Sequence, residues 1–482
     1  MTTAIQTSTP RVARRSWFAL AVLLVGAFMA LLDTTIVNVA IPTIRTSIGA
    51  SNTTLSWIIS GYALAFGLAL IPAGRVGDRI GHKWVFIAGL SLFTVASLGC
   101  GLAHDDGQLI AARAVQGLGG GMFFTPITAL IQLMFSDRQR TRAFAIMGAT
   151  IGVSTALGPL AGGLIIEAFG SNLGWRLVFG VNIPIGMLAV TAAFLLLPDA
   201  AGDTDTAADW LGLVLLSAGL VAVLIPLIEG QQQGWPWWTY ATMTGGVGLL
   251  ALFGLWERRI ENTHGYPLVP PRLFTHPSFT GGVLLALVYF AAFTSIFFTI
   301  ALLWQAGLGR SALQSGLVVV PFAIGLVIGA AQSDKLALRF GRGVLIAGLG
   351  LVAVGITALW LVLLRVPETD YNGWQLLGPL LAAGVGSGLF IAPNVDFIVA
   401  TVDRADAGAA SGVIGTVQRV GSAIGIAVIG TALFGTLHFS VHGPNATAIA
   451  FGHSATIAMA ISAALSVAAF ALVFTLPSRK RD

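Results

Sequence analysis

Long runs of apolar residues alternate with short polar segments along the whole chain. Each run is close to the roughly 20 residues that an α-helix needs to cross the hydrocarbon core of a bilayer. The runs predict fourteen transmembrane helices, over residues 17–42, 55–77, 84–103, 108–133, 141–166, 176–197, 210–229, 238–256, 279–305, 312–335, 343–365, 374–398, 407–436 and 450–476. Because the runs are continuous rather than alternating at every second position, they exclude a transmembrane β-barrel. We therefore expect an all-α polytopic membrane protein.

The composition agrees with this pattern. Of the 482 residues, 56% are hydrophobic and only 9% are charged. Soluble proteins carry about 25% charged residues, so this chain has too few charges for a soluble enzyme. None of the three lysines precedes Ser or Thr, which excludes a Walker A loop, and neither a His-Glu pair nor a G-x-S-x-G segment occurs. The sequence predicts no enzyme, no metal site and no cofactor other than protons as a coupling ion.

Basic residues gather on alternate connections. If the N-terminus is cytoplasmic, 19 of the 25 Lys and Arg lie on the inner side and four on the outer side, while Arg113 and Arg419 lie within helices. This positive-inside bias predicts that both termini are cytoplasmic. Residues 198–209 carry four Asp and no base on the same side, but acidic residues weigh little in this rule. The net charge of +5 therefore indicates contact with anionic membrane lipids and not with nucleic acid.

One acidic residue lies well inside a predicted span. On the first helix, Asp33, Thr34 and Asn38 fall within about 140° of one another, so one face of an apolar helix is polar. A lipid-facing Asp is costly, so this face is expected to line a cavity or a polar interface. Burial favours the neutral form of a carboxyl group, which predicts that Asp33 binds and releases a proton. The alternative is a structural Asp that locks helix packing through hydrogen bonds.

Arg113 lies within the fourth predicted helix, with Gln116 on the same face. An Arg at that depth needs a partner, and Asp33 is the best acidic candidate in the outer half of the bundle. The pair predicts that Arg113 assists proton release from Asp33. The alternative is a fixed counter-charge that never moves.

The connection between the second and third helices, residues 74–83, reads GRVGDRIGHK. An Asp at a helix end, followed by Gly and surrounded by bases, indicates a charge-locked hinge. A weaker copy, LALRFGR, follows at residues 336–342, with Leu338 in the place of Asp78. The chain thus has two related halves, as many secondary transporters do.

The fifth helix carries small residues and a proline. Gly148, Gly152 and Ala156 recur at every fourth position, which predicts a close helix–helix contact. Pro159, directly after Gly158, removes a backbone hydrogen bond and predicts a kink.

Four of these segments together resemble the major facilitator superfamily, in its fourteen-span drug:proton antiporter branch. They are residues 74–83 (loop motif), 113–117 (fourth-helix motif), 158–163 (antiporter signature) and 32–42 (first-helix pattern). Ser154 departs from the fifth-helix motif, which usually begins with Gly. The resemblance implies an N-terminal six-helix bundle (1–197), an acidic linker with two inserted helices and a cytoplasmic connection (198–277), and a C-terminal six-helix bundle (278–482).

The resemblance also implies roles for individual residues. Asp33 and Arg113 would couple transport to protons; Gly74, Asp78, Arg79 and Gly81 would hold the cytoplasmic gate; Gly158 and Pro159 would shape the hinge. Substrate contacts are expected, from their depth, at Asn38, Trp57, Tyr62, Gln116, Gln305 and Arg419. Glu229 and Asp396 are further acidic candidates, but each lies at a helix end, where solvation is expected. Arg419 would serve the second bundle as Arg113 serves the first, with a packing role as the alternative.

The expected function is proton-driven export of hydrophobic, cationic drugs or antiseptics by alternating access. The alternative is a dedicated exporter of one endogenous product, such as an antibiotic, siderophore or lipid. Proton-coupled uptake fits less well, because the segment at Gly158–Pro159 resembles the antiporter signature. The expected setting is the inner membrane of a bacterium, with membrane lipids as neighbours and a monomeric chain.

Overall fold

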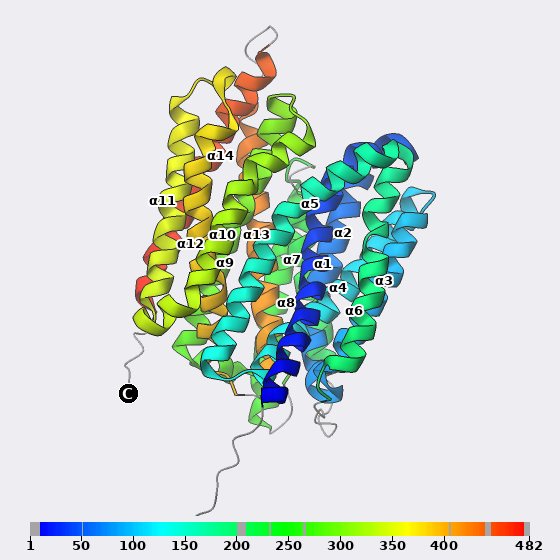
Figure 1. Ribbon diagram of the computed structural model, residues 1–482, viewed down its shortest axis with the longest axis vertical. Coiled ribbons are helices and arrows are strands. Elements are labelled where there is room, and N and C mark those ends of the chain that lie inside the picture. The colour runs from blue at the N-terminus through cyan, green and yellow to red at the C-terminus, as the bar shows by residue number, and fades with distance from the viewer. Residues whose placement is uncertain are drawn as a thin grey trace, which may run out of the picture.

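The computed structural model describes residues 10–50, 52–199, 209–230, 233–263, 267–403, 406–438 and 445–476, and these residues form helices without any strand (Figure 1). The helices are α1 (Pro10–Ile48), α2 (Asn52–Ile80), α3 (His82–Leu102), α4 (Asp106–Met134), α5 (Asp137–Gly180), α6 (Asn182–Leu196), α7 (Trp210–Glu229), α8 (Trp237–Asn262), α9 (Pro277–Leu302), α10 (Ala312–Phe340), α11 (Gly343–Arg365), α12 (Gly373–Val399), α13 (Ala407–Gly435) and α14 (Ala446–Leu472). Short turns occur at η1 (Pro271–Thr275), η2 (Leu303–Gly307), η3 (Glu368–Asp370) and η5 (Val473–Thr475).

Thirteen helices within the described residues are long and apolar enough to cross a membrane. The expected fifth span, 141–166, falls on α5, and the side chains of Thr155, Ala156 and Pro159 there lie outside the described part of the chain. The count of fourteen spans therefore stays a prediction. Helix α5 also runs further than expected, to Gly180, and bends at Gly170, whose φ of 75° suits a residue without a side chain.

The helices pack as two groups joined by a hairpin. Helices α1 to α6 pack mainly on one another, as do α9 to α14, while α7 and α8 form a pair that touches α2 and α13. Contacts between the groups run from α5 to α10 and α12, and from α2 to α13. The boundaries at 197 and 278 that the sequence implied stay a prediction.

The beginning of α1 and the end of α14 lie at the same end of the bundle, the lower end in Figure 1. The end of α2, with Arg75, and the beginning of α5, with Arg140, lie at this end as well. We call it the basic end. It is the end that the charge pattern predicts to be cytoplasmic.

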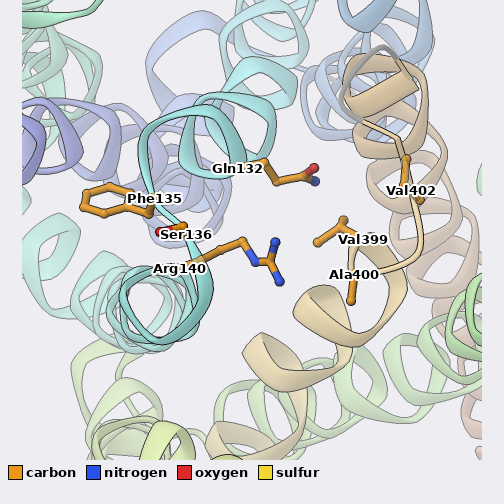
Figure 2. A pocket seen from close by; sticks show the side chains of 7 residues that line it. All are labelled: Gln132, Phe135, Ser136, Arg140, Val399, Ala400 and Val402. Carbon is orange, nitrogen blue, oxygen red and sulfur yellow. The ribbon is translucent and has the colours of Figure 1, made fainter. Parts of the chain in front are cut away.

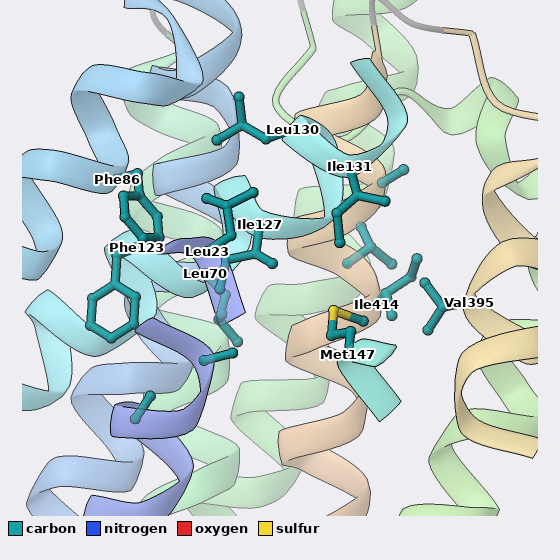
Figure 3. Packing of buried hydrophobic residues seen from close by; sticks show 14 of the residues in the cluster. Leu23, Leu70, Phe86, Phe123, Ile127, Leu130, Ile131, Met147, Val395 and Ile414 are labelled. Carbon is teal, nitrogen blue, oxygen red and sulfur yellow. The ribbon is translucent and has the colours of Figure 1, made fainter. Parts of the chain in front are cut away.

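The two groups share one apolar cluster toward the basic end. Figure 3 shows Ile131 of α4 and Met147 of α5 next to Val395 of α12 and Ile414 of α13. All four side chains are at most 5% exposed. Because this cluster crosses from one group to the other, separating the groups here would expose apolar surface.

Within each group, glycines let helix backbones touch. In the contact between α10 and α12, a Cβ on Gly384 would overlap the carbonyl oxygen of Phe322, and one on Gly388 would overlap that of Leu326. In a bilayer, where lipid tails are as apolar as the helices, such close backbone packing supplies much of the association energy. The high glycine count of the chain, 60 residues, has this structural reason.

We predict that Gly384→Leu destabilises the protein because its side chain would push α10 from α12. Overpacking of this kind costs about 1–3 kcal/mol. Thermal unfolding of the purified protein in detergent measures the loss. The matched control is Gly378→Leu on the same helix, where an added Cβ meets nothing within 4 Å. Equal losses for both variants would contradict the packing role.

Candidate functional site

Asp33 lies at the centre of a buried polar cluster in the first group of helices. Its side chain, on α1, has no solvent exposure. Arg113 Nη1 of α4 donates to Asp33 Oδ2 at 2.6 Å, the ion pair that the sequence predicted. Gln116 Nε2 and Asn182 Nδ2 donate to Asp33 Oδ1 at 2.9 Å and 3.1 Å. Two helices, α4 and α6, therefore hold the carboxylate of α1, which suits a residue that cannot stay charged in an apolar interior without partners.

Arg113 is held on several sides. Its Nε donates to the backbone oxygen of Ile58 at 3.1 Å, and its Nη1 also donates to Gln116 Oε1 at 2.6 Å. The guanidinium carbon lies 4.1 Å from the centre of the Tyr62 ring, a cation–π contact. Arg113 is only 1% exposed. Without its Asp33 contact, Arg113 would therefore still be bound to Ile58 of α2 and to Gln116 of its own helix.

Gln116 is the junction of the cluster. Its Nε2 donates to Ser97 Oγ of α3 at 2.7 Å as well as to Asp33, and its Oε1 accepts from Arg113 and from Cys100 Sγ at 3.5 Å. The amide thus uses both its donor and its acceptor side. Gln116 therefore links Asp33 to Ser97 of α3 through hydrogen bonds.

Sequence reasoning missed Asn182 and Ser97 as site residues. Asn182 begins α6 and is 1% exposed, and it also donates to Ser97 Oγ at 3.4 Å. The signal for Asn182 was present, as an amide residue at the start of a predicted span within an Asn-Ile-Pro segment. Ser97 offered none, because serines are common in apolar helices.

The remaining residues expected to contact substrate lie in different places, and of these Tyr62 lies in the Asp33 cluster. Tyr62 belongs to the cluster through Arg113, and its hydroxyl donates to the Ala30 oxygen at 3.2 Å. Trp57 is half-buried on α2, and Gln305 is exposed on η2 after α9. Arg419 lies on α13, in the other group of helices, and contacts Phe66 of α2. The side chains of Asn38 and Pro159 lie outside the described residues.

The fifth helix contacts both groups through its small residues. A Cβ on Gly158 would overlap the Thr35 hydroxyl, so α5 crosses α1 two residues from Asp33. Gly148 and Gly152 face the second group instead, against Ala392 of α12 and Leu326 of α10. One helix therefore connects the Asp33 cluster to the interface between the groups.

Asp78 connects the two groups at the basic end. Its Oδ1 accepts from the backbone nitrogen of Gly408, in the first turn of α13, at 3.1 Å. A carboxylate at a helix N-terminus is favoured by the free N–H groups and the helix dipole. Arg75 and His82 also lie 3.4 Å and 3.2 Å from the carboxylate.

The glycines of this segment explain its shape. A Cβ on Gly74 would overlap the Gly408 oxygen, so α2 and α13 touch through glycine on both sides. Gly81 has a φ of 97°, which permits the sharp turn between α2 and α3. Arg79 is exposed at the end of α2.

Two further bridges cross the basic end. Arg140 Nε of α5 donates to Asp396 Oδ1 of α12 at 2.9 Å. Arg140 lines a cavity of about 170 Å³ and reaches into it beside Val399 and Ala400 (Figure 2). Arg272 of η1 binds both oxygens of Asp406, at the start of α13. The basic end is therefore closed by ion pairs and by the shared apolar cluster.

Two acidic residues differ from expectation. Glu229, at the end of α7, is 5% exposed and accepts from Gln233 at 3.2 Å, so the expectation of a solvated side chain is wrong there. Asp396 is bound by Arg140 and by Thr141. Both lie at helix ends, but tertiary packing covers them, which a span prediction does not reveal.

Comparisons with known proteins agree with this architecture. The family model described as "Major Facilitator Superfamily" matches residues 23–426. The chain is 36% identical to the "Probable actinorhodin transporter" of Streptomyces coelicolor, over 91% of this chain and 75% of that protein. It is 35% identical to the "Methylenomycin A resistance protein" of the same organism, over 89% and 87%. It is 32% identical to the "Tetracenomycin C resistance and export protein" of Streptomyces glaucescens, over 86% and 76%.

Among solved structures, the fold is similar to that of the proton:xylose symporter XylE. The TM-score is 0.64, at 13% identity, with 93% of this chain and 95% of that chain covered. At this identity the likeness concerns the fold alone.

We predict that Asp78→Asn opens the basic end more often, because a neutral amide binds the α13 N-terminus more weakly than a carboxylate does. The loss is expected to be about 0.3–1 kcal/mol. Faster backbone hydrogen exchange at residues 407–412 would measure it, and transport turnover should fall while substrate affinity is kept.

The matched control for that variant is Asp334→Asn, near the end of α10. The Asp334 carboxylate accepts a hydrogen bond from the backbone nitrogen of the next residue, Lys335. Loss of substrate binding in Asp78→Asn, or equal exchange in both variants, would contradict the gating role.

Proposed function

The chain belongs to the major facilitator superfamily, a family of membrane transporters and not of enzymes, and we propose that it is a proton-coupled antiporter that exports small hydrophobic molecules of antibiotic type. The observation that carries the proposal is the fully buried Asp33, held by Arg113, Gln116 and Asn182 within the membrane-spanning helices. The names of the relatives support the direction of transport, because several are antibiotic export or resistance proteins.

Protonation of Asp33 would act on helix contacts. A proton on the carboxylate removes the charge that pairs with Arg113, while Arg113 keeps Ile58 O, Gln116 and the Tyr62 ring. The contact of α1 with α4 weakens, and α4 stays bound to α2. Since Gly158 places α5 directly on α1 beside this site, the change reaches the helix that also contacts α10 and α12.

Alternating access then requires the basic end to open. The contacts that must break there are Asp78 with Gly408, Arg140 with Asp396, and Arg272 with Asp406. Each of these is polar and reversible. We place the basic end in the cytoplasm of a bacterial cell, with the chain as a multi-pass protein of the inner membrane.

A second candidate function is the export of one endogenous product. It is favoured by relatives whose names state a single compound, such as actinorhodin, cephamycin or tetracenomycin C. A transport screen of structurally unrelated compounds separates the two candidates. Transport of many unrelated compounds supports a multidrug exporter, and transport of one compound supports a dedicated exporter.

The preference for cationic substrates stays a prediction. It rests on Asp33 as the one acidic group of a mostly apolar cavity. In the structure both oxygens of Asp33 are engaged, and Arg113 is the nearest charged group. The charge of the substrate must therefore be argued from other residues.

We predict that Asp33→Asn abolishes substrate-induced proton release in proteoliposomes, because the amide cannot exchange a proton. A pH-sensitive dye measures the release. Exchange of labelled substrate across the membrane without a gradient, which needs no net proton movement, should persist and shows that the variant is folded.

The control for Asp33→Asn is Glu167→Gln, an exposed acidic residue of α5, which should release protons as the unaltered protein does. Unchanged proton release in Asp33→Asn would contradict the coupling role.

A further inference from the structure

Arg419 is a cation near the middle of α13 for which the structure shows no acidic partner. Among the described residues, no carboxylate lies within ion-pair distance of it, and the closest acidic residue on its own helix end, Asp406, is bound by Arg272. Its one recorded contact is with an aromatic ring. The guanidinium carbon lies 4.1 Å from the ring centre of Phe66 on α2.

Among the described residues, no acidic side chain therefore balances the charge of Arg419. Asp33 and Arg113 neutralise each other at 2.6 Å, so they contribute no net charge. Arg419 remains. A cation in an apolar interior is costly, and the residue types that tolerate it are paired or face a polar cavity. A ring face compensates only part of that cost, because it covers one side of the guanidinium plane.

The exposure of Arg419 differs from that of its neighbours. Tyr62 and Phe66 on α2 are each 1% exposed, whereas Arg419 is half-buried. Part of the Arg419 surface is therefore not covered by protein atoms. The guanidinium has five N–H donors in a flat fork, and no described residue accepts a hydrogen bond from them.

Aromatic side chains support Phe66 from behind. Phe66 packs on Tyr62 at 5.9 Å and on Phe124 of α4 at 5.7 Å between ring centres, and Phe124 is half-buried. Phe66 is 1% exposed, so its ring covers one face of the guanidinium and does not reach a ligand. The fork and the other face of the guanidinium match an aromatic molecule that bears a carboxylate or a phenolate. Arg binds such oxygens in a bidentate manner and stacks on planar rings.

We propose that Arg419, held in place by Phe66, recognises an anionic group on an aromatic substrate, and that this protein selects anionic over cationic compounds. The inference rests on the proposed export function and names its substrate class. It places the anionic group at Arg419 of α13, the helix that meets α2 at Gly74 and Gly408 nearer the basic end. An anion bound there would balance the charge of Arg419 and hold the same pair of helices together, which connects substrate binding to the gate.

Two dyes that share a xanthene ring test the proposal. Fluorescein is an anion at slightly alkaline pH, and pyronin Y is a cation of similar shape. Fluorescence polarisation with the purified protein in detergent measures binding without any gradient. We expect fluorescein to bind more tightly than pyronin Y. Arg419→Gln should weaken fluorescein binding roughly ten- to a hundredfold, the range of a charge-assisted hydrogen bond, and leave pyronin Y binding equal or tighter.

Two further variants separate recognition from folding. Arg419→Lys keeps the charge without the fork and should retain a preference for fluorescein with weaker binding. Arg365→Gln, at the exposed end of α11, is the matched control and should bind both dyes as the unaltered protein does. The dye preference of the unaltered protein tests the proposal even where Arg419→Gln does not fold.

Several outcomes would overturn the inference. They are tighter binding of pyronin Y by the unaltered protein, equal weakening of both dyes by Arg419→Gln, or no change in fluorescein binding. Proton-driven dye transport is measured separately in proteoliposomes. Binding selectivity without proton-driven transport would contradict the proposed antiport and leave the assignment of the anion site standing.

Discussion

The cost of a charge in the apolar interior of a membrane determines how this structure is organised. An ion that leaves water loses several kcal/mol of solvation, and only a close partner with good geometry returns it. Asp33 meets this constraint with three side-chain donors from two other helices, and Arg113 meets it with a carboxylate, two further oxygens and a ring. The packing of α1, α2, α4 and α6 is arranged around this requirement. A charge change at Asp33 is therefore a change in helix packing.

The cost of burying a charge differs between the ends and the middle of the bundle, so charges at different depths suit different roles. At the basic end, where solvent reaches the helix ends, ion pairs such as Arg140 with Asp396 form and break at low cost, which suits a gate. Near the middle of the bundle, Arg419 contacts only an aromatic ring among the described side chains, and we propose that its charge serves in recognition. Helix α2 carries residues of all three regions, from Ile58 and Tyr62 at the Asp33 cluster, through Phe66, to Asp78. One helix thus touches the proposed proton site, the proposed anion site and the proposed gate.

Sequence reasoning succeeded where the physical signal is local. The apolar runs, the polar face at Asp33 and the glycine-rich turn at Gly81 are all properties of neighbouring residues, and the pairing of Arg113 with Asp33 followed because few acids lie at that depth. It failed where the signal is distant. Asn182 comes from a helix 149 residues away from Asp33. The substrate contact expected of Gln305 stays a prediction. Asp78 has the basic neighbours Arg75 and His82 that the sequence indicated, but its contact with Gly408, 330 residues further on, could not be predicted.

The sequence by itself determined that this is a helical membrane protein, because hydrophobic length and charge bias are properties of consecutive residues. It also determined which few residues had to find partners. Only the tertiary structure decided who those partners are, because hydrogen bonds and ion pairs depend on the crossing of helices that are distant in the chain. It showed that Asp33 is paired with Arg113, while Arg419 contacts the ring of Phe66, and this difference is the basis on which we propose an anionic substrate. That difference arises from a few ångströms of packing, which no pattern along the chain specifies.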